Sequence, residues 1–64
     1  MPVELAELSS LSTMLEEVTK RITSLADRAA SAKDEDASGE LYGIERALRG
    51  AGRRLDRLVR DQQR

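Results

Sequence analysis

Apolar residues recur at alternating steps of three and four between residues 8 and 32, and this repeat constrains the fold more than any other feature. If Leu8 is position a of a heptad, every a and d position up to residue 32 is apolar. The row consists of Leu8, Leu11, Leu15, Val18, Ile22, Leu25, Ala29 and Ala32. Such a row is typical of a helix that packs along another helix. The repeat therefore predicts an all-α fold.

The first predicted helix spans about residues 3–32. Pro2 suits a first helical turn, where its missing N–H costs nothing, and Glu4 suits the positive end of the helix dipole. These residues favour a start near residue 3. Thr13 and Glu16 fit a capping box and offer a later start.

A polar stretch without periodicity, residues 33–39, follows the first row and predicts a loop. Ser38 suits the N-cap of a second helix, and Glu40 suits its first turn. A second heptad row then contains Leu41, Ile44, Leu48, Ala51, Leu55 and Leu58. The chain is therefore predicted to be one domain, residues 1–64, with a second helix over about residues 40–62.

Two long helices joined by a short polar loop predict an antiparallel two-helix hairpin. A fold point near residue 36 would place Ala51 opposite Ile22. In that register Leu5 and Leu8 extend past the end of the second helix, so that nothing in the same chain covers them.

The expected hairpin also needs a partner, because 64 residues without a disulfide or metal bury too little apolar surface to be stable alone. In an antiparallel pair the e positions of both helices share one side. That side is mostly small or apolar, whereas the g side is mostly charged. We therefore expect a dimer that forms a four-helix bundle. Its predicted interface comprises Leu5, Leu8, Leu11, Leu15, Thr19, Ala26, Gly52 and Val59.

The composition argues against several function classes. The chain has no Cys and no His, so disulfides, thiolate sites and the usual proton shuttle of enzymes are all missing. We expect no catalytic residue and no cofactor. No run approaches the roughly 18 apolar residues of a membrane span, and no signal peptide is recognisable. We therefore expect a cytoplasmic protein without a membrane partner.

Residues 34–45 offer an alternative function, because their spacing resembles the calcium loop of the EF-hand family. Gly39 falls at the sharp turn of that loop. The resemblance implies Ca²⁺ as a ligand, held by Asp34, Asp36, Ser38, the Glu40 carbonyl and Glu45. The flanks depart from the family, since Arg46 and Arg49 stand where the outgoing helix is normally apolar. An acidic turn between two helices gives much of the same pattern.

A stripe of arginines on the second helix is a further candidate binding surface. It comprises Arg46, Arg49, Arg53, Arg57 and Arg60. Such a stripe suits phosphates or an acidic protein partner. No aromatic residue is interleaved with it for stacking on bases, which favours a protein partner over nucleic acid.

In length and expected architecture the chain resembles the Rop family of short helical hairpins. That resemblance implies a dimeric four-helix bundle, and it adds RNA binding through the arginine stripe as a further alternative. The hypothesis that the sequence favours is a non-enzymatic, self-associating helical hairpin that acts as an adaptor or scaffold.

Overall fold

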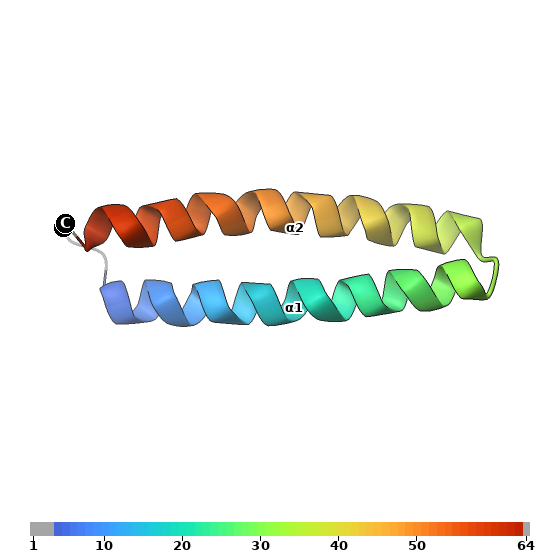
Figure 1. The fold of residues 1–64 in the computed structure, drawn as a ribbon, viewed down its shortest axis with the longest axis horizontal. Helices are drawn as coiled ribbons and strands as arrows, with labels where there is room; N and C mark the ends of the chain where they lie inside the picture. The colour runs from blue at the N-terminus through green and yellow to red at the C-terminus, as the bar shows by residue number, and fades with distance from the viewer. Residues whose placement is uncertain (1–3, 64) are drawn as a thin grey trace.

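The computed structural model of the chain describes residues 4–63, which form two antiparallel helices side by side (Figure 1). Helix α1 spans Leu5–Ser31 and helix α2 spans Glu35–Gln62. The molecule is a rod of 47 × 15 × 14 Å. The predicted all-α hairpin is therefore confirmed.

Helix α1 begins at Leu5, close to the earlier of the two predicted starts. The predicted start at residue 3 itself lies outside the described residues. Thr13 is inside the helix, where its hydroxyl donates to the Ser9 carbonyl at 3.2 Å instead of capping a helix end. Among the described residues, no side chain forms a capping hydrogen bond at the N-terminus of α1.

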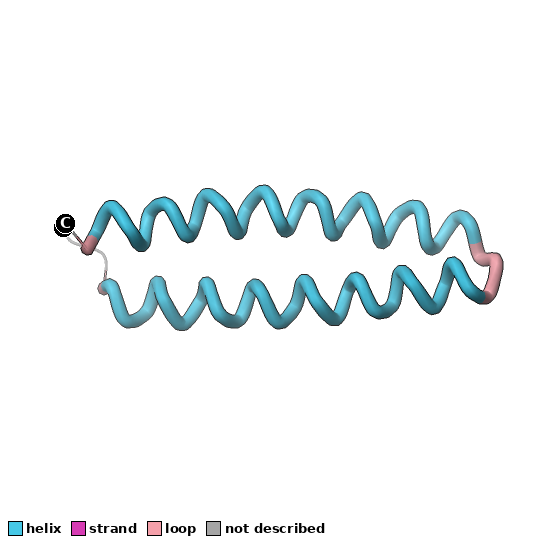
Figure 2. The backbone as a smooth tube through the Cα atoms, viewed as in Figure 1, coloured by secondary structure: helices cyan, strands magenta, loops and turns pink. Residues whose placement is uncertain are grey.

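The connection between the helices is only three residues long. It appears as the short pink loop in Figure 2. Lys33 adopts a left-handed backbone conformation with φ of 62°. Its N–H donates to the Ala30 carbonyl, and the N–H of Asp34 donates to the Ala29 carbonyl at 2.9 Å. These two bonds form a Schellman motif, which satisfies carbonyls left open at the end of α1.

Helix α2 begins at Glu35, about five residues before its predicted start. Asp34 is the N-cap, because its Oδ1 accepts a hydrogen bond from the Ala37 N–H at 3.2 Å. Glu35 and Asp36 follow in the first turn, where negative charge is favourable to the helix dipole. Ser38, the predicted N-cap, lies inside the helix and donates to the Glu35 carbonyl. The predicted loop over residues 33–39 is therefore too long.

The two helices contact each other mainly through their a and e positions. Leu8, Thr19 and Ala26 are buried, and a β-carbon on Gly52 would lie 3.8 Å from Leu15. Small residues at the e positions allow the two backbones to approach closely. The a and e positions, rather than the predicted a and d positions, therefore form the contact within the hairpin.

The register of the hairpin also differs from the prediction. Ser12 pairs with Asp56, and Thr23 pairs with Glu45, so the numbers of paired residues add to about 68. The fold point is thus near residue 34 instead of 36. Because α2 starts earlier, it is as long as α1 and covers Leu8, which is only 6% exposed. The expected overhang of Leu8 is wrong.

The shifted register also changes the partners of the middle residues. Ala51 was expected opposite Ile22, but it now lies at the level of Val18. Both of these side chains are at d positions, and both are exposed. Each of these two side chains is therefore exposed on the surface of the hairpin and does not point at the opposite helix.

Candidate functional site

Large apolar side chains at the d positions lie together on one exposed side of the hairpin. Because α1 and α2 are antiparallel, equal heptad positions of the two helices fall on the same side. These d residues are 39–45% exposed, and the neighbouring Met14 is 58% exposed. We call this surface the exposed apolar flank, and it comprises Leu11, Met14, Val18, Leu25, Ile44 and Leu58. Met14 is at a g position, next to the d row.

Most of the predicted oligomer interface is used within the hairpin instead. Ala26 is fully buried, Thr19 is 7% exposed and Gly52 lies against Leu15. Leu5, Leu15 and Val59 are half-buried, and Leu8 is buried. Of the predicted set, Leu11 is the member that belongs to the exposed apolar flank. This corrects the side on which association is expected, whereas association itself stays a prediction.

Sequence reasoning missed most of the exposed apolar flank because it assigned the d positions to the contact within the hairpin. A signal was present, since apolar or small residues occupy the a, d and e positions together. A stripe of that width exceeds the narrow a/d contact of two helices alone. It indicates that each helix can contact more than one neighbour.

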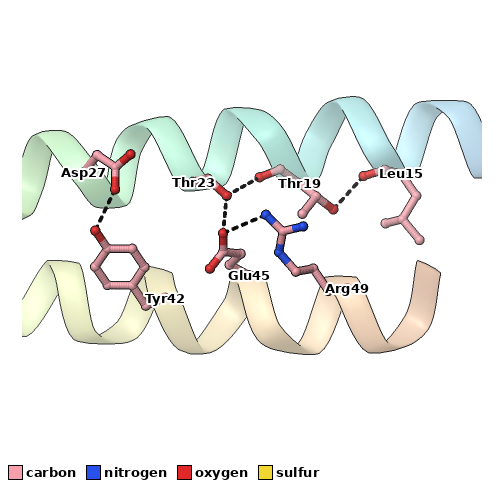
Figure 3. A network of polar contacts seen from close by, with 7 residues as sticks. All are labelled: Leu15, Thr19, Thr23, Asp27, Tyr42, Glu45 and Arg49. Carbon is pink, nitrogen blue, oxygen red and sulfur yellow. Dashed lines mark hydrogen bonds and ion pairs between the residues drawn. The ribbon is translucent and has the colours of Figure 1, made fainter. Parts of the chain in front are cut away.

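The side opposite the exposed apolar flank is polar and carries three hydrogen-bonded links between the helices. The Ser12 hydroxyl donates to Asp56 near one end of the rod. The two links in the other half of the rod are drawn in Figure 3. There the Thr23 hydroxyl donates to Glu45, and the Tyr42 hydroxyl donates to Asp27. These links satisfy polar groups on this side and make it a poor surface for apolar contacts.

Glu45 is the most enclosed carboxylate of this polar side. Its side chain is 16% exposed and lies 3.0 Å from an Arg49 nitrogen. The hydrogen bond from the Thr23 hydroxyl, followed by the one from Arg49, lowers the pKa of Glu45 below its ordinary value of 4.5. The ionised form of Glu45 therefore joins α2 to α1 at neutral pH (Figure 3).

Tyr42 donates a hydrogen bond of 2.6 Å to Asp27 Oδ1. This bond to a carboxylate raises the pKa of Tyr42 above 10.0, because it favours the neutral phenol. No sequence pattern indicates this link, since the two residues are brought together only by the register of the hairpin.

The residues of the predicted calcium loop do not form a loop. Asp36, Ser38, Glu40 and Glu45 lie within the continuous helix α2, and Asp34 caps its N-terminus. An EF-hand requires a loop that wraps its oxygens around the ion. Over residues 4–63, no group of three or more acidic side chains is placed so that it could hold a metal. The expected EF-hand backbone is therefore wrong.

The arginine stripe lies on the exposed surface of α2, as predicted. Arg49 pairs with Glu45, and the second ion pair found among the described residues joins Lys20 to Glu16. The remaining arginines of the stripe are Arg46, Arg53, Arg57 and Arg60. These four side chains are available to a partner that carries negative charge.

A shallow hollow lies between the arginine stripe and the exposed apolar flank, in the middle of α2. Its small residues are Ala47, Gly50 and Ala51. The arginines around them are Arg46, Arg53, Arg54 and Arg57. Most of these residues, including Arg46, Arg53 and Arg57 of the arginine stripe, lie on the outer face of α2, and Ala51 is the d residue at the edge of the hollow.

A second groove, of about 390 Å³, runs along the polar side between the helices. Thr19, Gly52 and Asp56 are among the residues that line it. Its lining combines the acidic residues Glu16 and Asp56 with cationic residues that include Lys20. This mixture of charges offers no uniform field for an ion or a charged substrate.

Within the described residues, neither helix combines the length and apolar character needed to cross a membrane. The resemblances to the EF-hand loop and to the Rop hairpin rest on a short motif and on architecture. Comparisons across the whole chain add no relative: no family model, curated protein or solved structure matches it.

Proposed function

We propose that this protein is a non-enzymatic helical hairpin that pairs with a second copy through its exposed apolar flank. The pair is a four-helix bundle that serves as an adaptor or scaffold. The observation that carries this proposal is the grouping of six large, exposed apolar side chains on one side of the rod. Contiguous apolar surface of this kind marks interaction sites in soluble proteins.

The packing of the isolated hairpin supports association. No large side chain among residues 4–63 is fully buried. A compact protein of 7.1 kDa exposes about 4,100 Å², whereas the hairpin exposes 5087 Å². The excess of about 1,000 Å² is similar to the roughly 800 Å² that each partner contributes to a standard interface. One further copy is therefore enough to cover it.

Val18→Glu tests the proposal, because it places a charge at the centre of the exposed apolar flank. Ser24→Glu is the matched control, since it makes a similar change at an exposed c position of the same helix. We expect sedimentation equilibrium to show a dimer for the original chain and for Ser24→Glu. Burying the new carboxylate should weaken the Val18→Glu dimer at least about tenfold, or about 1.4 kcal/mol.

Leu25→Glu provides a second variant at the same flank, and it should weaken the dimer in the same way. The proposal fails if the original chain is a helical monomer at micromolar concentration. It also fails if both flank variants dimerise as tightly as Ser24→Glu.

The arginine stripe supports a second, separable role in binding an acidic protein. Its residues lie on the outer face of α2 and not on the exposed apolar flank, so a dimer leaves them accessible. Arg46, Arg53, Arg57 and Arg60 have no ion-pair partner among the described residues. A phosphate-rich ligand such as RNA stays the weaker alternative, because the stripe lacks an aromatic side chain for stacking on bases.

A further inference from the structure

At the middle of the rod the exposed apolar flank carries a larger side chain on α1 and a small one on α2. Val18 and Met14 project from the middle of α1 and are 45% and 58% exposed. In the register of the hairpin Val18 is level with Ala51, a small d residue between the larger Ile44 and Leu58 of α2. The flank is therefore not flat, and its relief restricts how two copies can meet.

Two symmetric dimers can bring one flank against another. If the two-fold axis runs along the rod, both loops lie at the same end and α1 faces α2 of the partner. If the axis crosses the rod, the loops lie at opposite ends and each helix faces its own copy. Both arrangements place facing helices antiparallel, so only side-chain fit distinguishes them.

We infer that the two hairpins pair with their loops at the same end, so that Val18 of each copy packs against the small side chain of Ala51 of the other. This inference rests on the proposed function, because it concerns the geometry of the same dimer. The opposite arrangement sets Val18 on Val18 and Ala51 on Ala51. A methyl-sized gap in a core costs about 1 kcal/mol, and the paired alanines would leave such a gap.

In the outer layers of the dimer, large d residues face large d residues in either arrangement. The register places Leu11 at the level of Leu58, and Leu25 at the level of Ile44. In the inferred dimer each leucine of α1 meets a large residue of the partner's α2. The middle layer of Val18 and Ala51 therefore decides between the two arrangements.

The charged residues beside the flank do not reverse this preference. With the loops together, Arg28 approaches Glu40 of the partner, but Glu7 approaches Asp61. With the loops apart, Arg28 approaches Glu7, but Glu40 approaches Asp61. Exposed pairs of this kind contribute about 0–1 kcal/mol each. Each arrangement has one favourable and one unfavourable kind of pair, so the charges largely cancel.

Cysteine cross-linking tests the inference directly, because the natural chain has no cysteine of its own. Two single-cysteine chains are needed, Val18→Cys and Ala51→Cys. Each is unfolded, refolded alone or as an equal mixture, and oxidised mildly. We expect a covalent dimer from the mixture and little from either chain alone, because only Val18 and Ala51 of different copies come within disulfide distance.

A label attached at Ser31→Cys gives an independent measurement, because Ser31 is exposed and ends α1 beside the loop. In the inferred dimer the two labels are close together at one end. In the opposite dimer they are separated by about the 47 Å length of the hairpin. Spin-label distance measurements distinguish the two values.

Rapid cross-linking of Val18→Cys or Ala51→Cys alone would overturn the inferred arrangement but leave the dimer intact. The same conclusion follows from a dimer with distant Ser31 labels, or from one in which no cysteine pair cross-links. A monomer in sedimentation equilibrium would instead reject the proposed function, and the inferred geometry with it.

Discussion

Tyr42 is the only aromatic residue of the chain, so its ionisation can be followed without interference from another side chain. Its hydrogen bond to Asp27 predicts a titration midpoint above 10.0 in near-ultraviolet absorbance. Asp27→Ala removes the acceptor and should return the midpoint towards 10.0. Asp61→Ala, far along the rod, should leave it raised.

The direction of the stability effect follows from the sign of this shift. A raised pKa means that the folded state favours the neutral phenol of Tyr42. The contribution of its hydrogen bond to the free energy of unfolding is therefore complete below pH 10.0. It is lost as the pH rises through the raised pKa. An unshifted midpoint in the original chain would show that the bond to Asp27 does not persist in solution.

The sequence only partly predicts which heptad positions contact the other helix of the hairpin. Leu8 and Leu15, both at a positions, contact the other helix as the repeat indicates. The repeat also placed Val18 and Leu25 there, yet both are 45% exposed. The choice between d and e depends on how closely two backbones approach. Thr19 and Ala26 permit that approach, and the apolar repeat alone does not reveal it.

Among the elements, the connection between α1 and α2 departs most from the prediction. The acidic run after Lys33 was interpreted as a loop because it lacks apolar periodicity. The same carboxylates are favourable in a helix N-terminus, where Asp34 caps the helix and Glu35 and Asp36 meet its dipole. Either structure suits this composition, and the Schellman turn at Lys33 decides between them.

Lys33→Gly tests this connection. Lys33 has a φ of 62°, a region in which a β-carbon costs about 1–2 kcal/mol. Glycine removes that cost, and we expect the free energy of unfolding to increase by about 1 kcal/mol. Denaturant titration gives the measurement. Lys33→Ala is the control for the lost charge, and a glycine variant no more stable than the alanine variant would contradict the prediction.

For the molecule as a whole, the predicted fold class is correct because two heptad rows and one break permit few alternatives. The side that we propose for association was not predictable, since it depends on which heptad positions are already buried within the hairpin. Val59 illustrates this, because it was assigned to a second copy but is half-buried in the hairpin. Its substitution by Glu is expected to destabilise the hairpin as well as any dimer.

Association also predicts how the whole molecule melts. If folding and pairing are coupled, dilution favours the unfolded chains by mass action. A tenfold dilution should lower the melting temperature by about 5 °C for a unit of this size. Circular dichroism at several concentrations provides the measurement. A melting temperature independent of concentration would indicate that the hairpin folds alone.

The near-equal lengths of α1 and α2 give the rod two unlike poles. The described chain enters at Glu4 and leaves at Gln63 at one pole, while the turn at Lys33 occupies the other (Figure 1). A fluorescent tag or a longer polypeptide joined to either end would emerge from the same pole. In the inferred dimer Glu4 and Gln63 of both copies share that pole, so whatever is fused there is held side by side, and the turns stay free.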